Sequence, residues 1–515
     1  MLESVELLIN LGYSKKEAEA IISSFPLVNL KDGTLCKNIN ENFNYLIGLG
    51  YTKVDVIKMT KHFPALYRYS KETIEEKITF LISLGYTRPD VIKMAKFLPA
   101  LYSYSKENIK VKIAFLISLG YTKSDVIKMT KKLPSLYSYS KETIEEKISF
   151  LVSLGYTKTD LINMTKNFPS LYGYGKETIE EKIVFLVSLG YTRSDVIKMT
   201  KSLPQLYSFS KETIANKINF LISLGYTKSD VIKMTKSFSS LYSLSKETIE
   251  EKIAFLMSLG YTKADVIKMT KLLPSLYGYS KENIEEKITF LMSLGYTKPD
   301  VIKMTKHLPS LYSLSKKTIE EKISFLISLG YTKSDVIKMT KLLPTLYGLS
   351  KETIEEKISF LISLGYTKVD VIKMTKILPS LYGLSKENIE EKIVFLISLG
   401  YTKADVINMT KLLPTLYGLS KETIEEKIKY LKDIGLEDIV INDTKQLMQS
   451  AHLTYARYEF LIKEKCISID EFNYRKLFYN ETMFKKQYGV SKEVLLKKYS
   501  YEDYKEKKKC LIKKC

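Results

Sequence analysis

The sequence has no tryptophan, only three histidines and only four cysteines among its 515 residues. The histidines, His62, His307 and His452, lie far apart, so they predict neither a zinc cluster nor a histidine-based triad. The cysteines show no paired metal-ligand spacing and are too few to stabilise so long a chain, which favours a reducing compartment. Because it also lacks a glycine-rich phosphate loop and a nucleophile beside a base, we predict a protein that is not an enzyme and uses no cofactor or metal.

Long apolar runs and targeting segments are also missing. No apolar run approaches the about 20 residues that a transmembrane helix needs, so no membrane association is predicted. The N-terminus, Met1 to Leu8, opens directly into a helical pattern, with neither a basic region before an apolar core nor an arginine-rich presequence. We therefore expect a cytoplasmic protein, bacterial or cytosolic.

Acidic residues are scarce relative to basic ones. Lys and Arg number 80 against 58 Asp and Glu, which gives a formal net charge of +22. This excess favours polyanionic partners, nucleic acid first and an anionic membrane second. The alternative is a lysine-rich soluble surface, as the coding bias of an AT-rich genome would produce.

Glycine is sparse, but eleven of the 22 glycines lie in Leu-Gly-Tyr triplets spaced 35 residues apart. Self-similarity at such a period is typical of a solenoid, and diverged units at both ends, around Gly12 and Gly435, are typical of its caps. The eleven glycines are Gly50, Gly85, Gly120, Gly155, Gly190, Gly225, Gly260, Gly295, Gly330, Gly365 and Gly400.

The repeats predict an all-α fold, an α-solenoid of about a dozen helix–corner–helix units with short 3₁₀ segments, wound as a right-handed superhelix. We divide the chain into a diverged N-terminal capping repeat (1–45), an array of eleven near-identical repeats (46–436), and a C-terminal helical cap with a basic tail (437–515). We expect a monomer.

The first helix of a unit is predicted from its start and stop signals. In one unit Thr122 supplies a hydroxyl N-cap and Asp125 an acid three residues later, which resembles a capping box. A helix over 125–133 follows, and Pro134 marks its limit.

The second helix of the same unit follows a short connector. Residues 135–139 are too few for a full helix and predict a 3₁₀ turn. Ser140 then caps a helix over 141–154, which ends at Gly155. Each helix has one apolar face, so a unit must stack on its neighbours to bury both.

Two lysines recur on the first helix, away from its apolar face. At about 100° per residue, Val126, Met129 and Leu133 share one direction, while Lys128 and Lys131 lie well away from it. Two units depart, with Asn163 and Asn408 at the first lysine position. We predict a nucleic-acid-binding stripe made of Lys58, Lys61, Lys93, Lys96, Lys128, Lys131, Lys198, Lys201, Lys233, Lys236, Lys268, Lys271, Lys303, Lys306, Lys338, Lys341, Lys373 and Lys376.

On the second helix the outward residues are Glu145, Glu146 and Ser149, so its exposed face is predicted to be predominantly acidic. Ordinary solvation of both helices is the alternative, but it gives no reason for the two signs to separate. A continuous basic track is what a phosphate backbone requires, because binding releases condensed counterions. The charge pattern therefore favours a nucleic-acid partner.

Three segments resemble the mitochondrial transcription termination factor (mTERF) family. Residues 329–347, Leu-Gly-Tyr-Thr-Lys-Ser-Asp-Val-Ile-Lys-Met-Thr-Lys-Leu-Leu-Pro-Thr-Leu-Tyr, resemble its motif of a helix, a leucine–proline corner and a short 3₁₀ segment. Residues 453–462 resemble the helix that closes such arrays, in which Arg457 precedes the last leucine-rich turn, and 484–489 resemble the segment after it.

The resemblance implies a curved α-solenoid that binds double-stranded DNA, or in some members RNA, and regulates transcription, including its termination. It also adds Arg457 to the candidate nucleic-acid contacts. Two features depart from the family pattern: the repeats are nearly identical to one another, and no organelle presequence is visible.

Two other classes fit a 35-residue helical repeat. A pentatricopeptide-like RNA reader would encode bases at variable positions, here the one within the N-cap (Ser124) and the one before the corner (Lys132), although drift at half-exposed sites would look the same. A protein-binding scaffold would present its grooves to peptides.

Tyrosines after each corner (Tyr102, Tyr137) and after each glycine (Tyr86, Tyr121) could stack on bases, but their fixed positions favour packing over the helix ends. The final stretch, 505–515, is a basic tail that could add phosphate affinity or could be a frayed terminus.

Overall fold

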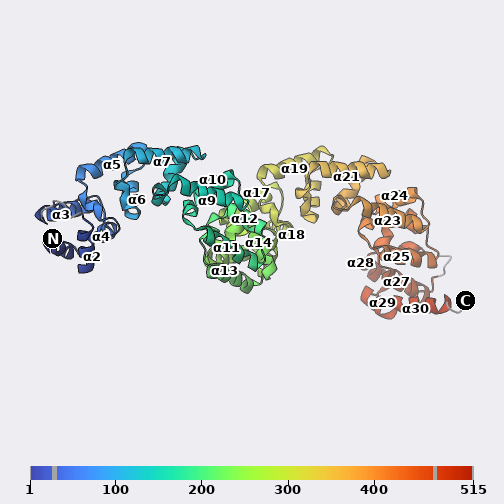
Figure 1. Cartoon of the computed structure of the whole chain (residues 1–515). Coiled ribbons are helices and arrows are strands. Elements are labelled where there is room, and N and C mark those ends of the chain that lie inside the picture. Colours follow the sequence, from blue (N-terminus) through green and yellow to red (C-terminus); the bar gives the residue numbers. More distant parts are fainter. Residues whose placement is uncertain (1, 26–31, 468–472, 513–515) are drawn as a thin grey trace. The chain divides into compact units, whose positions relative to one another are not determined.

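The described chain, residues 2–25, 32–467 and 473–512 of this computed structural model, is a succession of helices joined by short turns (Figure 1). Those residues contain no strand. The prediction of an all-α solenoid is therefore confirmed, whereas the superhelical hand stays a prediction.

Each repeat begins with a helix of ten residues, which we call the A helix. Its start is confirmed: in α8, Asp125 N donates to Thr122 Oγ1 at 3.1 Å, and Thr122 N donates to Asp125 Oδ2 at 2.9 Å. The helix itself begins at Lys123, directly after the N-cap, two residues before the predicted start. The A helices are α4 (Lys53–His62), α6 (Arg88–Phe97), α8 (Lys123–Lys132), α10 (Lys158–Asn167), α12 (Arg193–Ser202), α14 (Lys228–Ser237), α16 (Lys263–Leu272), α18 (Lys298–His307), α20 (Lys333–Leu342), α22 (Lys368–Ile377) and α24 (Lys403–Leu412).

A short 3₁₀ helix turns the chain at each corner. Where a proline is present it is the first residue of this turn, because its missing N–H and fixed φ suit that position. The 3₁₀ helices are η1 (Pro64–Arg68), η2 (Pro99–Tyr102), η3 (Pro134–Tyr137), η4 (Pro169–Gly173), η5 (Pro204–Tyr207), η6 (Ser239–Tyr242), η7 (Pro274–Gly278), η8 (Pro309–Tyr312), η9 (Pro344–Gly348), η10 (Pro379–Tyr382) and η11 (Pro414–Gly418).

A longer helix, the B helix, completes the repeat. Ser140 caps α9 as predicted, and the glycine after the helix adopts the left-handed conformation, with φ of 108° at Gly155. The B helices are α5 (Lys71–Leu84), α7 (Lys106–Ser118), α9 (Lys141–Ser153), α11 (Lys176–Leu189), α13 (Lys211–Leu224), α15 (Lys246–Leu259), α17 (Lys281–Leu294), α19 (Lys316–Ser328), α21 (Lys351–Leu364), α23 (Lys386–Ser398) and α25 (Lys421–Asp433).

Diverged helices flank the array. Before it lie α1 (Leu2–Asn10), α2 (Lys15–Ser23) and α3 (Asp32–Gly48). After it, α26, η12 and α27 repeat the A–3₁₀–B order in shortened form. The elements are α26 (Ile439–Asn442), η12 (Thr444–Met448), α27 (Ala451–Lys463), η13 (Tyr474–Phe478), α28 (Glu481–Tyr488), α29 (Lys492–Lys498) and α30 (Tyr501–Ile512).

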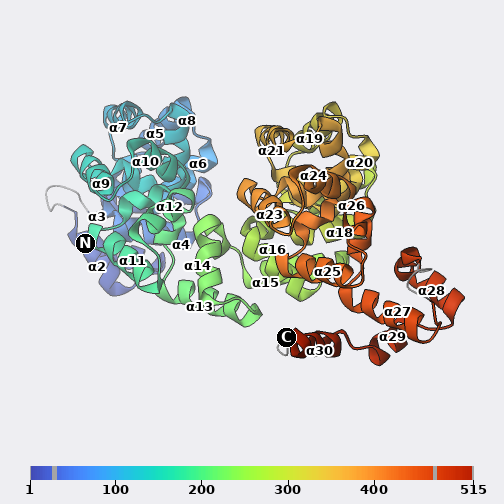
Figure 2. The same cartoon turned by 90° about the vertical axis from the view of Figure 1, so that its right-hand side faces the viewer.

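The chain forms two compact units that divide within the array. The first comprises residues 1–254 and 273–278, and the second 255–272 and 279–515. Within each unit the A helices of successive repeats contact one another, as α8, α10 and α12 do (Figure 2). The predicted division into 1–45, 46–436 and 437–515 rests on repeat type and stays a prediction; its residues 26–31, 468–472 and 513–515 lie outside the described part.

A chain of buried hydroxyls joins neighbouring repeats. Thr130 donates to the carbonyl of Val126 at 2.8 Å, and its oxygen lies 2.6 Å from the Tyr86 hydroxyl, which lies 2.7 Å from that of Tyr137. Since each hydroxyl has one hydrogen, Tyr137 donates to Tyr86 and Tyr86 donates to Thr130. We call this the hydroxyl chain. The same three hydroxyls meet in the triads Tyr13–Thr60–Tyr67, Tyr121–Thr165–Tyr172, Tyr156–Thr200–Tyr207, Tyr191–Thr235–Tyr242, Tyr261–Thr305–Tyr312, Tyr296–Thr340–Tyr347, Tyr331–Thr375–Tyr382 and Tyr366–Thr410–Tyr417.

A buried lysine forms a second link between repeats. Lys147 of α9 donates to the carbonyl of Tyr174, 27 residues further on, and burial lowers the pKa of this lysine. At the end of the array Lys427 donates to the carbonyl of Leu447 at 2.6 Å, so the link continues into the diverged C-terminal repeat. The same contact with the connector of the following repeat is made by Lys77, Lys112, Lys182, Lys217, Lys287, Lys322, Lys357 and Lys392.

One repeat lacks its threonine, which allows a test of the hydroxyl chain. Ala95 replaces the threonine, and Tyr51 and Tyr102 bond only to each other there, at 2.9 Å. We expect Ala95→Thr to raise the free energy of local opening by about 1 kcal/mol, because it supplies the missing acceptor and one further hydrogen bond.

The matched reverse change is Thr130→Ala, which should lower the same free energy by about 1–2 kcal/mol. Native-state hydrogen exchange of the two repeats measures both changes. An unchanged exchange rate in Ala95→Thr would show that the threonine hydroxyl contributes nothing at this interface.

Candidate nucleic-acid interface

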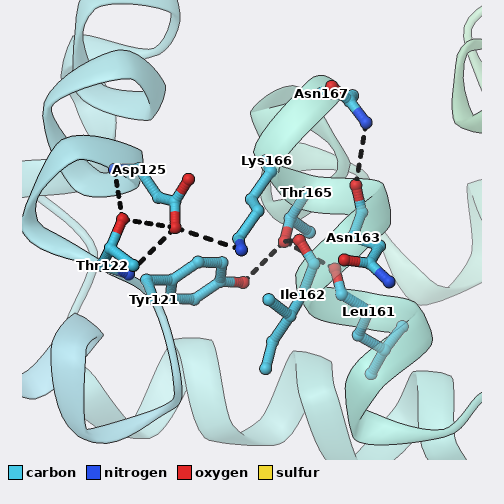
Figure 3. Close-up of polar contacts among 9 residues, drawn as sticks. All are labelled: Tyr121, Thr122, Asp125, Leu161, Ile162, Asn163, Thr165, Lys166 and Asn167. Carbon is cyan, nitrogen blue, oxygen red and sulfur yellow. Dashed lines mark hydrogen bonds and ion pairs between the residues drawn. The ribbon is translucent and has the colours of Figure 1, made fainter.

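A lysine nine residues after the N-cap threonine of an A helix, such as Lys131 or Lys166, binds a carboxylate of the preceding repeat. Figure 3 shows Lys166 of α10 reaching back to α8, where its Nζ lies 3.1 Å from Asp125 Oδ2. We call these residues the bridging lysines. The other pairs, at 2.5–3.1 Å, are Lys61–Glu17, Lys96–Asp55, Lys131–Asp90, Lys201–Asp160, Lys236–Asp195, Lys306–Asp265, Lys341–Asp300, Lys376–Asp335 and Lys411–Asp370.

The carboxylate of each pair also serves the capping box. Asp125 Oδ2 accepts from Thr122 N at 2.9 Å and from Thr122 Oγ1 at 2.7 Å, in addition to its contact with Lys166. In the next repeat, Lys201 and the Thr157 backbone hold the pKa of Asp160 at about 2. One acid therefore both starts an A helix and ties it to the A helix that follows.

The lysine six residues after the N-cap threonine, present in nine A helices and exemplified by Lys128, makes no such contact. Lys128 lies two residues, about 200°, from buried Val126 and is exposed. Within the described part of the chain these side chains form no ion pair. We call them the outer lysines: Lys58, Lys93, Lys128, Lys198, Lys233, Lys268, Lys303, Lys338 and Lys373.

The repeats differ at the outer lysine position but keep the bridging lysine. In the two repeats where the outer position is Asn163 or Asn408, the bridging lysine remains, as Lys166 and Lys411. The structure thus separates the eighteen predicted lysines into a stacking set and a set available to a ligand.

The variable positions flank the outer lysines on the same face. Ser124 and Lys132 lie four residues before and after Lys128, so the three side chains form one row. In some repeats the row carries an apolar residue, such as Phe97, which is 73% exposed. The outer face of the A helices therefore combines a regular lysine with changing neighbours.

Arg457 does not belong to this face, which corrects the prediction. Its side chain is 2% exposed, and Nη1 donates to the carbonyl of Leu477 at 2.8 Å and to Gln449 Oε1 at 3.0 Å. The guanidinium also lies 4.3 Å from the centre of the Phe484 ring. Arg457 thus holds the C-terminal helices together and is not accessible to a nucleic acid.

The tyrosine rows are interior as well. Tyr86, Tyr121, Tyr102 and Tyr137 are buried, and their hydroxyls are bonded within the hydroxyl chain or its Ala95 variant. The packing interpretation is confirmed, and these rings are not available for stacking on bases.

Most B helices present acids, as expected. Glu145 and Glu146, with the uncharged Ser149 beside them, are exposed on α9. Two repeats depart: α7 has Lys110 and Val111 at the two glutamate positions, and α13 has Ala215 and Asn216. The predicted separation of charge is therefore present on the surface of most repeats, where a polyanion would meet repulsion on the B helices.

The sequence analysis did not predict that the bridging lysines pair with acids of the preceding repeat, nor that Lys147 is buried. The signal for the first was a fixed offset of 41 residues between each capping acid and a lysine, as from Asp125 to Lys166. The burial of Lys147 was indicated by its spacing: it lies three residues from buried Ile144 and four from buried Leu151, so it shares their helix face.

Two other kinds of site were sought in the described residues. Among them, no group of three or more His, Cys, Asp and Glu side chains could hold a metal ion. Across the same residues, no helix combines the length and apolar character needed to cross a bilayer.

Comparison with known proteins gives one result for the whole chain. The model of the family described as mTERF matches residues 1–154, 137–258, 241–363, 310–442 and 347–470. These matches overlap and together span residues 1–470, which include the entire repeat array. A search of curated proteins gives no match.

Because the bridging lysines pair with carboxylates, we predict that low pH weakens the contact between neighbouring A helices. The folded pKa of Asp160, about 2, is below its ordinary value of 3.8, so its contribution is present above about pH 4 and is lost as the pH falls towards 2. We expect protection of α12 against hydrogen exchange, corrected for intrinsic rates, to fall over that range.

The Asp160→Asn variant is the control for this prediction. It should show weaker protection of α12 at pH 7 and a smaller change on acidification, because the pair with Lys201 is already absent. Protection that is independent of pH in the unmodified protein would contradict the role assigned to the pair.

Proposed function

Because the chain belongs to the mTERF family of nucleic-acid-binding helical-repeat proteins, we propose that it binds double-stranded DNA through its outer lysines and acts in the termination of transcription. The observation that carries this proposal is the separation of the lysines into two sets. The bridging lysines are paired with acids, whereas the outer lysines form a row of exposed ammonium groups, without such a pair, along most A helices.

A regular row of single charges suits a phosphate backbone. Each phosphate that a lysine neutralises releases condensed counterions, which supplies affinity without reading the bases. The buried tyrosine rows favour a duplex over a single strand, because recognition of unpaired bases relies on exposed aromatic rings.

The same contacts would support termination. A protein that engages several phosphates of one duplex obstructs a polymerase that moves along it. Many of the changing residues beside the outer lysines, such as Phe97 and Leu272, are apolar and form no hydrogen bonds with base edges, so backbone contacts dominate this mode of binding.

Fluorescence anisotropy tests the choice of partner. The purified chain is titrated onto labelled duplex DNA, single-stranded DNA and RNA over a range of salt concentrations. We expect duplex DNA to bind most tightly, with a log–log salt slope steeper than about −4. No binding to any of the three at low salt would overturn the proposal, and preference for a single strand would replace duplex DNA with RNA or single-stranded DNA.

A matched pair of variants identifies the lysines involved. The first has Gln at the five outer positions 58, 93, 128, 198 and 233, and the second has Gln at the bridging positions 61, 96, 131, 201 and 236. Both lose the same charge and all ten positions lie in the first compact unit. We expect the outer variant to flatten the slope by about 0.9 per contacting lysine, and the bridging variant to keep the slope but unfold at lower temperature. Equal flattening in both variants would mean that net charge, and not the outer row, determines binding.

A further inference from the structure

The B helices of neighbouring repeats border a groove with an aromatic floor, one acidic wall and a lysine on the opposite side. In one repeat it has a volume of about 480 Å³, and its lining includes Glu285, Glu286 and Phe290 of α17 and Lys316 of α19. Three glutamates and one lysine line this groove, so its charge is negative. Equivalent grooves with the same Glu–Glu–Phe arrangement lie on α11, α21 and α23.

The groove has two further properties of a docking surface. Met292, on the same side of α17 as Glu285 and seven residues from it, is 44% exposed, which provides an apolar rim. The Phe290 ring already receives an ammonium group, because Lys316 Nζ lies 5.8 Å from its centre. The surface therefore suits a ligand with both positive and aromatic groups.

The last groove of this series is occupied by the chain itself. α25 carries Tyr430 and Glu426, 35 residues after Phe395 and Glu391 of the preceding groove. α30 lies against α25 and α27: the Tyr501 and Tyr504 rings each lie 5.5 Å from the Tyr430 ring, edge to face. Tyr430 is only 1% exposed as a result.

Charge pairs complete this contact. Lys505 Nζ lies 2.9 Å from Glu426 Oε1, and Lys508 pairs with Asp433. The docked residues of α30 are at positions 501, 504, 505 and 508, which is the i, i+3, i+4, i+7 pattern of one helix face. The basic stretch that begins at Lys505 is therefore, up to Lys508, part of a packed helix and not a frayed terminus.

We propose that the B-helix grooves of the array bind a basic helix of a partner protein, one that carries tyrosines and lysines on a single face as α30 does. The glutamates receive its lysines, and the phenylalanine floor and apolar rim receive its aromatic rings. This site is separate from the outer lysines, which lie on the A helices, so one chain could hold a nucleic acid and a protein at once. The proposal does not rest on DNA binding.

The test uses a peptide with the sequence of residues 500–509 as the probe. The labelled peptide is titrated with the full chain, and calorimetry counts the bound copies. We expect more than one peptide per chain, because several grooves share the lining. A peptide with Tyr501→Ala and Tyr504→Ala keeps every lysine but should bind at least about 10-fold more weakly.

Two protein variants of equal charge locate the site. Glu285, Glu286, Glu355 and Glu356 are changed to Gln in one, and Glu6, Glu19, Glu437 and Glu493, all exposed and outside the grooves, in the other. We expect the groove variant to bind about two peptides fewer and the control variant to bind as the unmodified chain does. Circular dichroism checks that both remain helical.

Three results would overturn the proposal. They are no peptide binding at low salt, equal binding of the peptide without tyrosines, and an equal loss in the groove and control variants. None of these measurements includes nucleic acid, so failure here is distinct from failure of the proposed function.

Discussion

The interface between successive repeats depends on the hydroxyl chain that joins Tyr137, Tyr86, Thr130 and the carbonyl of Val126. A buried hydroxyl without a partner costs about 1–3 kcal/mol, so these groups specify how one repeat sits on the next. Two further contacts join neighbouring repeats: the ion pair between Lys166 and Asp125, and the hydrogen bond from the buried Lys147 to the carbonyl of Tyr174. All three contacts join residues of different repeats, so a constant repeat length keeps the partners in register.

This requirement determines which lysines remain for a ligand. Lys131 and its equivalents recur because they bind the capping acid of the preceding A helix, whereas Lys128 and its equivalents have no such partner. The unpaired surface charge of the A helices is therefore smaller than the number of lysines suggests, and the outer lysines form its most regular row across the array. The acids of the B helices, such as Glu285 and Glu286, form a different surface with different chemistry.

The C-terminal helices show how the ends of the chain use the same contacts. Lys427 donates to the carbonyl of Leu447 in the shortened repeat. α30 covers Tyr430, whereas the phenylalanine at the equivalent position of an array helix, such as Phe395, is half-buried. Beyond the last repeat no further repeat of the described chain stacks on the array; there Arg457 donates hydrogen bonds to Gln449 and to the carbonyl of Leu477. The C-terminal helices thus close the end of the array, but they do not continue the hydroxyl chain: the buried Tyr401 hydroxyl has no hydrogen-bond partner among the described residues.

The sequence by itself determined the helix pair, its capping and its corner, because these depend on residues within about five positions of one another, as Thr122 and Asp125 are. It also determined the repeat period and the separation of charge between A and B helices. Only the tertiary structure decided which lysine is outer, bridging or buried, and that Arg457 is interior. The physical reason is distance along the chain: the partners of Lys166, Lys147 and Arg457 lie 41, 27 and 20 residues away, where helical periodicity carries no information.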